Sequence, residues 1–113
     1  MLLPSRESAV VDPYKVREYL LNPDHPDGRP KAAFFQRLGF DRSRWIELRW
    51  ALLELAAYGK AEQLGYSAFG AKYSTTGRIQ GPNGRSASVV AIWIIETGTD
   101  WPRLVTAYPG GER

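Results

Sequence analysis

The 113-residue sequence has no cysteine and a single histidine, His25. Without cysteine there can be no disulfide, no thiol nucleophile and no thiolate zinc site, and such a chain suits a reducing compartment. One histidine cannot form a histidine cluster for a metal. No run of about 18 apolar residues could cross a membrane, and the first apolar residues are too few for a secretory signal. These absences predict a soluble, cytoplasmic protein that uses no metal or other cofactor.

The remaining composition is that of one small globular domain. A chain of this length can build one hydrophobic core but not two, so residues 1–113 should form a single domain with its core at about residues 11–109. The chain has 15 lysine and arginine residues against 12 aspartate and glutamate residues, which gives a net charge of +3. This mild positive excess favours a polyanionic partner.

The most informative stretch is the apolar run SASVVAIWIIE at residues 86–96. Both sets of alternate positions are apolar, which predicts a strand that is buried on both faces. A Gly-Pro-Asn-Gly turn precedes this run and a Thr-Gly-Thr turn follows it. The β-rich runs at residues 71–80 and 103–108 should then pair with it on either side, so that the three strands form an antiparallel meander with the apolar strand in the middle.

Helices are predicted only before this meander. A first helix begins at Asp12-Pro13, where the aspartate caps the helix and the proline occupies its first position. A short helix follows at residues 31–38, and a longer amphipathic helix at residues 43–57 should cover one face of the sheet. Residues 59–70 have no clear pattern and are expected to be a connection. Helices first and strands afterwards predict an α+β fold.

The loop at residues 22–31 is the first candidate site. It brings His25, Arg29, Lys31 and two aspartates together ahead of a helix. A helix N-terminus attracts anions such as phosphate. His25 could act as a general base or acid, while Arg29 and Lys31 could hold the anion and neutralise its charge. A surface loop with solvated side chains is the alternative interpretation of the same residues.

The last strand supplies a second candidate. Alternation places Thr106 and Tyr108 on one face of this strand, where a hydroxyl and a phenol side by side could bind phosphate. Alternatively, Tyr108 packs at the rim of the sheet with its hydroxyl in water.

Cations on the predicted sheet form a third candidate. They are accompanied by Trp101, which could stack on a base, and this mixture of charge and aromatic faces is what RNA contacts need. Cations on a sheet edge also prevent aggregation, which is the alternative interpretation. The residues concerned are Lys72, Arg78, Arg85 and Arg103.

Three segments carry a family resemblance: HPDGRPKAAFF at residues 25–35, GPNGR at residues 81–85 and RLVTAYP at residues 103–109. Over about residues 11–109 the chain resembles an uncharacterised small bacterial domain family. That family in turn is similar to the toxin ribonucleases of the barnase, EndoU, colicin and RelE superfamily. The resemblance implies a fold in which N-terminal helices pack on a C-terminal antiparallel β-meander.

The same resemblance implies metal-independent RNA cleavage, in which the ribose 2′-hydroxyl attacks the adjacent phosphate and leaves a 2′,3′-cyclic end. It implies His25 as base or acid, Lys31 beside the phosphate and Thr106 with Tyr108 as a pair on the last strand, with Arg85 as a looser candidate. EndoU enzymes use two histidines, so Lys31 or Tyr108 would have to complete the acid–base pair here.

The implied partners are RNA and a small cognate antitoxin or immunity protein. The alternative is a non-catalytic module of a toxin–antitoxin-like pair, which binds a protein or RNA through the same face.

Overall fold

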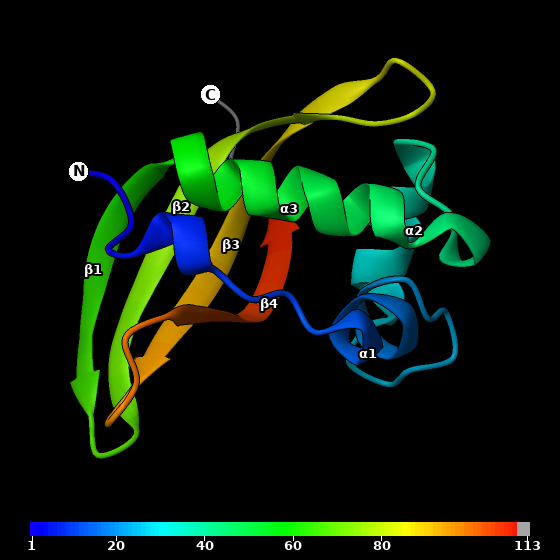
Figure 1. The fold of residues 1–113 in the computed structure, drawn as a ribbon. Helices are drawn as coiled ribbons and strands as arrows, with labels where there is room; N and C mark the ends of the chain where they lie inside the picture. The colour runs from blue at the N-terminus through cyan, green and yellow to red at the C-terminus, as the bar shows by residue number, and fades with distance from the viewer. Residues whose placement is uncertain (111–113) are drawn as a thin grey trace.

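The computed structural model describes residues 1–110, in which helices pack on a four-stranded antiparallel sheet (Figure 1). The strands pair in sequence order, β1-β2-β3-β4. The predicted α+β fold, with N-terminal helices and a C-terminal meander, is therefore confirmed. In chain order the elements are η1 (Arg6–Ser8), α1 (Pro13–Lys15), η2 (Val16–Leu20), α2 (Arg29–Arg37), η3 (Arg42–Arg44), α3 (Ile46–Tyr58), β1 (Lys60–Ser67), β2 (Gly70–Gln80), β3 (Ser86–Glu96) and β4 (Pro102–Pro109).

Strand β3 lies between β2 and β4, as its sequence predicts. Val89, Ala91 and Trp93 on one face are completely buried, and α3 crosses the sheet on this side, mainly over β2 (Figure 1). Val90 and Ile92 on the opposite face are only half-buried. The prediction that this strand is buried on both faces is therefore wrong for part of its second face, because α3 covers only the first. The second face is called the open face below.

The predicted connection at residues 59–70 is also wrong, because it contains strand β1. This strand pairs with β2 from Lys60 opposite Thr76 to Ser67 opposite Gly70, with a register shift between Gln63 and Gly65. Its residues are exposed except for Ala61. An edge strand of this kind is held by its backbone ladder rather than by buried side chains, so the hydrophobic pattern is weak.

The helices begin and end close to their predicted limits. The first predicted helix is divided into the short helix α1 and the wider, π-type turn η2. The third begins later than predicted, because Asp41 caps the 3₁₀ turn η3 by accepting a hydrogen bond from the Ser43 N–H (3.1 Å). Helix α3 starts only after that turn, at Ile46.

The segment before α1 runs beside the last strand. Val10 forms a parallel bridge with Arg103, in which the Val10 N–H donates to the Pro102 carbonyl (2.8 Å) and the Leu104 N–H donates to the Val10 carbonyl (3.0 Å). Leu3, which precedes the predicted core, is also buried. This pairing places α1 and η2 next to β4, so it positions the site described below.

None of the helices formed by residues 1–110 is long and apolar enough to cross a membrane.

Candidate functional site

A hollow of about 510 Å³ lies between the first helical segment, the loop that follows it and strand β4. Two consecutive β4 residues, Val105 and Thr106, line it together. Successive strand residues normally point to opposite faces, but the register with β3 shifts here: Ile92 pairs with Thr106 and Trp93 with Leu104. The resulting bulge re-aims these side chains. We call this cavity the tyrosine hollow; its lining residues are Tyr14, Lys15, Tyr19, His25, Asp27, Val105 and Thr106.

Tyr19 stands at the centre of the tyrosine hollow. Its hydroxyl lies 3.0 Å from the Thr106 Oγ1 atom, in a hydrogen bond between residues 87 positions apart. The ammonium groups of Lys15 and Lys31 lie 5.2 and 5.3 Å from the centre of its ring, and the His25 ring meets it edge-on at 5.0 Å between centroids. A hydroxyl, an imidazole and two ammonium groups therefore gather around the phenol of Tyr19.

The imidazole of His25 is held in a defined state by its own loop. Its Nδ1 atom accepts hydrogen bonds from the backbone N–H groups of Asp27 (3.0 Å) and Gly28 (3.1 Å). An atom that accepts two N–H donors carries no hydrogen itself, so the ring hydrogen of neutral His25 is assigned to Nε2. The Nε2–H group is then a hydrogen-bond donor. A general base or acid was predicted at this position. To act as a general base through Nε2, His25 would have to break both loop contacts.

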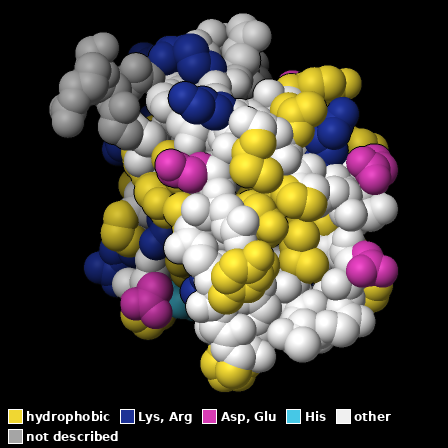
Figure 2. Space-filling view, turned by 90° about the vertical axis from the view of Figure 1, so that its left-hand side faces the viewer, with side chains coloured by type: hydrophobic (Ala, Val, Ile, Leu, Met, Phe, Trp, Pro, Cys, Tyr) yellow, Lys and Arg dark blue, Asp and Glu magenta, His cyan; other side chains and the backbone are white. Residues whose placement is uncertain are grey.

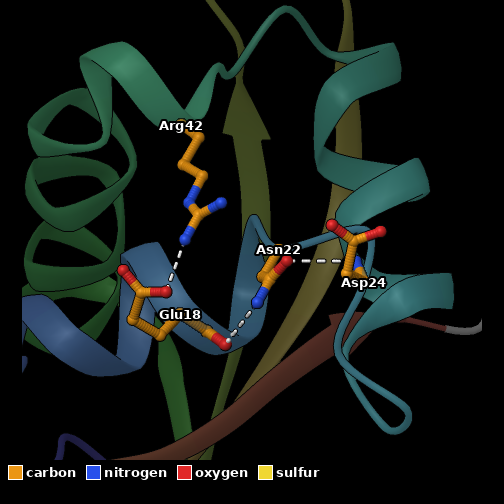
Figure 3. A network of polar contacts seen from close by, with 4 residues as sticks. All are labelled: Glu18, Asn22, Asp24 and Arg42. Atoms are coloured by element: carbon orange, nitrogen blue, oxygen red, sulfur yellow. Dashed lines mark hydrogen bonds and ion pairs between the residues drawn. The ribbon is translucent and has the colours of Figure 1, made fainter.

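A polar network fixes the start of this loop (Figure 3). The Asn22 side chain donates to the Glu18 carbonyl (3.2 Å) and accepts from the Asp24 N–H (3.0 Å). Arg42 of η3 forms an ion pair with the Glu18 carboxylate, as Figure 3 shows. These contacts join the loop to the carboxyl end of η2, from which Tyr19 projects.

Gly28 closes the loop against η2. A side-chain Cβ at this position would lie 2.0 Å from the Tyr19 carbonyl oxygen, which is far closer than two such atoms can approach. The loop that holds His25 therefore needs glycine here for space. The backbone of Asp27 is also fixed on both sides, since its N–H donates to His25 and its carbonyl accepts from the Lys31 ammonium (3.3 Å).

A second hollow, of about 410 Å³, adjoins the first and shares Lys15 and Val105 with it. It lies on the open face of the sheet, beneath the β1–β2 turn. Arg103 donates to the Glu96 carboxylate at its rim (3.1 Å), and this hydrogen bond and the Arg103 charge lower the pKa of Glu96 below its ordinary value. We call this cavity the hairpin hollow; its lining residues are Lys15, Ser67, Phe69, Lys72, Ile94, Glu96, Arg103 and Val105.

The structure brings some predicted catalytic residues together and leaves one apart. His25 and Thr106 line the tyrosine hollow, and Lys31 lies beside Tyr19. Tyr108 is on the same face as Thr106, since it pairs with Val90 two residues from Ile92, but it does not line either hollow.

The predicted substrate-binding cations are divided in the same way. Lys72 and Arg103 line the hairpin hollow. Arg29 donates to the Pro23 carbonyl (3.3 Å) of the loop that holds His25, residues 22–28, which we call the histidine loop. Arg85 lies in the turn between β2 and β3, at the opposite end of the sheet (Figure 1). Arg78 donates to Ser86 near that end, six residues along β2 from Lys72, or about 20 Å. One phosphate cannot reach all five cations.

Five lining residues of the tyrosine hollow were not among the predicted site residues: Tyr14, Lys15, Tyr19, Asp27 and Val105. Lys15 and Tyr19 are four residues apart in a helical stretch, a spacing that places two side chains on the same face and could have identified the pair. Among residues 1–110, no group of three or more His, Cys, Asp or Glu side chains is placed to hold a metal ion.

The chain belongs to the family described as a domain of unknown function (DUF6883), whose model matches residues 2–111. The predicted membership of an uncharacterised domain family is thus confirmed, while the similarity to toxin ribonucleases remains a prediction. No curated protein matches the sequence.

A chain of the contact-dependent growth inhibition toxin–immunity protein complex from Klebsiella pneumoniae 342 has a similar structure. The TM-score is 0.70, the sequence identity is 15%, and the match covers 96% of this chain and 98% of that chain. At this identity the similarity establishes a shared fold over nearly the whole length of both chains.

Proposed function

For this member of the DUF6883 family we propose a toxin-like ribonuclease activity that needs no metal ion. The ribose 2′-hydroxyl attacks the adjacent phosphorus, and the products carry a 2′,3′-cyclic phosphate and a free 5′-hydroxyl. The observation that supports this proposal most directly is the gathering of Lys15, Tyr19, His25 and Thr106 around one hollow. These residue types supply positive charge and hydrogen-bond donors, which an anionic phosphoryl transition state requires.

Phosphate binding is assigned to the donors of the tyrosine hollow. The ammonium groups of Lys15 and Lys31 flank Tyr19 and neutralise the negative charge of the phosphate. The Nε2–H group of His25, which its loop contacts leave as a donor, and the hydroxyl of Thr106 donate to phosphate oxygens. His25 therefore acts as a hydrogen-bond donor in this proposal, rather than as the general base or acid first predicted.

Two other residues of the hollow carry the protons. Asp27 supplies the carboxylate among the residues that line the tyrosine hollow, and it takes the proton of the 2′-hydroxyl. The backbone of Asp27 is fixed at its N–H and carbonyl groups. The Tyr19 hydroxyl gives a proton to the leaving 5′-oxygen, and the two nearby ammonium groups stabilise the phenolate that remains. This transesterification consumes no water. The protein returns to its starting protonation state when the Asp27 carboxyl releases its proton to solvent and the Tyr19 phenolate takes one up.

A non-catalytic role in a toxin–immunity pair is the second candidate. The similar solved chain belongs to a toxin–immunity protein complex, and the side of the molecule formed by β1 exposes a column of hydrophobic side chains (Figure 2). Exposed apolar side chains there include Leu64, Tyr66 and Phe69. Such a surface suits a protein partner. If this chain is the toxin-like member of the pair, the partner is an antitoxin or immunity protein; if this chain is the immunity-like member, the partner is a toxin.

Growth of a bacterial host after induced expression separates the two functions. A ribonuclease should arrest growth, and His25→Asn should relieve the arrest. Asparagine keeps an acceptor near the position of Nδ1 for the loop N–H groups but lacks the Nε2–H donor, so loss of toxicity would follow from lost chemistry rather than a collapsed loop. Tyr66→Ala, outside both hollows, should remain toxic. Wild-type protein that leaves growth unaffected would favour the binding module.

A further inference from the structure

The hairpin hollow is built as a flat apolar floor between cations. Ile94 of β3 pairs with Lys72 of β2 on one side and with Arg103 of β4 on the other. The three residues therefore form a row across the open face, and the backbones of Lys72 and Arg103 lie about 10 Å apart across the strands. Ile94 is almost fully buried, and Val105 extends the floor toward the tyrosine hollow.

Phe69 stands at the rim of this hollow on a fixed backbone. Its side chain is 77% exposed, so its ring is accessible to a ligand. Its carbonyl nevertheless accepts from the Thr97 N–H (3.0 Å), and its N–H donates to the Ser67 hydroxyl (3.1 Å). A third bond joins the Thr97 hydroxyl to the Ala68 carbonyl (3.3 Å). The β1–β2 turn is thus tied to the β3–β4 turn, and the backbone of Phe69 is held in place.

The residue after Phe69 fixes the same geometry. Gly70 has a φ of +146°, and a Cβ at this position would lie 2.2 Å from the Ile95 carbonyl oxygen. The turn can therefore approach β3 this closely only with glycine, which sets the height of Phe69 above the sheet.

We propose that the hairpin hollow binds an unstacked nucleobase of a single-stranded RNA, with Phe69 as its stacking surface. This inference rests on the proposed ribonuclease function and names the substrate class. A base offers a flat aromatic face to Phe69 and to the apolar floor, and the flanking phosphates complement Lys15 and Lys72. Arg103 already donates to the Glu96 carboxylate at the rim of the hollow. A volume of about 410 Å³ is in the range of small-ligand sites.

The two hollows adjoin, so one ligand could occupy both of them. Lys15 and Val105 line both, so a phosphate in the tyrosine hollow and a base in the hairpin hollow belong to neighbouring positions of one polymer. A base inside a duplex is stacked between its neighbours and cannot enter such a hollow without leaving the helix. The site therefore selects unpaired nucleotides in single strands or loops.

Binding to an RNA that cannot be cleaved tests this inference apart from catalysis. We suggest fluorescence anisotropy with a labelled single-stranded oligonucleotide that is 2′-O-methylated throughout. Phe69→Ala should weaken binding about tenfold, within the range measured for base–aromatic stacking. Tyr66→Ala is the matched control, because Tyr66 is a similarly exposed aromatic residue (81%) three positions away that does not line the hollow; its affinity should be unchanged.

A second measurement links the effect to a base. The same oligonucleotide with one abasic position, moved along the strand, should abolish the difference between wild type and Phe69→Ala at one position. Equal effects of Phe69→Ala and Tyr66→Ala, or a difference that persists at every abasic position, would overturn the inference. The second pattern would show that Phe69 contributes to RNA binding without contacting a base. If the protein cleaves RNA and Phe69→Ala changes neither cleavage nor binding, only the base site is contradicted. If Phe69→Ala weakens binding but the wild-type protein does not cleave RNA, only the proposed ribonuclease activity is contradicted.

Discussion

At the scale of single residues, one hydrogen bond in the core joins β2 to β3. The Trp93 Nε1–H group donates to the Thr75 hydroxyl (2.9 Å), and both residues are completely buried. No water can replace either partner at this depth, so the bond is needed to satisfy the indole N–H. It also explains why a threonine stands among the apolar side chains that face α3.

Thr75→Val should therefore destabilise the protein although it preserves the shape of the side chain. We expect a loss of about 1 to 3 kcal/mol in the free energy of unfolding, because the buried indole N–H is left without an acceptor. Urea denaturation followed by tryptophan fluorescence measures it. Thr76→Val, the neighbouring change on the half-buried open face, should shift stability by less than about 0.5 kcal/mol. Equal effects of the two changes would contradict this account.

The ion pair at the hairpin hollow predicts a pH dependence. Arg103 lowers the pKa of Glu96 through a hydrogen bond and through its charge, so the pair contributes stability above the ordinary carboxyl pKa and loses it as the pH falls through the lowered value. Arg103→Gln should return the Glu96 pKa toward its ordinary value. A titration followed by NMR of the Glu96 carboxyl carbon measures the change, and identical midpoints in both proteins would show that the pair does not form.

At the scale of elements, the predictable strands are those whose side chains are buried. The alternation in residues 86–96 specifies β3 because Val89, Ala91 and Trp93 all enter the core. The sequence of β1 has no β-branched residue and only one buried side chain, that of Ala61. Its conformation comes from the hairpin with β2, and its sequence has no alternating hydrophobic pattern that would predict a strand. The bulge in β4 leaves no signal either, because it depends on how β4 aligns with β3.

The histidine loop depends on one close contact with η2. Gly28→Ala should destabilise the protein by about 1 to 3 kcal/mol, as overpacked sites do, because the added Cβ would overlap the Tyr19 carbonyl oxygen. The same change should move His25 away from Tyr19 and reduce activity. Pro26→Ala, at an exposed position of the same loop, is the control for stability. Urea denaturation of both variants decides the point, and a stable Gly28→Ala protein would show that the loop packs differently.

At the scale of the whole molecule, the candidate site is assembled from two regions that are far apart in the chain, residues 14–31 and strand β4. The sequence indicated His25 and Lys31 in one candidate loop and Thr106 on the last strand, and the structure places all three around Tyr19. The central residue itself was not predicted, since a tyrosine in a helix is usually a packing residue. Its role depends on the bridge between Val10 and Arg103, which places η2 beside β4 and which no local pattern specifies.

The central claim is that the tyrosine hollow cleaves RNA without a metal. The most direct test incubates the purified protein with single-stranded RNA in excess EDTA and identifies the new ends by mass spectrometry. We expect 2′,3′-cyclic phosphate ends, and Tyr19→Phe and Asp27→Asn should each lower the rate about 100-fold or more, as loss of a general acid or base does. Cleavage that requires added magnesium, or that is unchanged in both variants, would contradict the account.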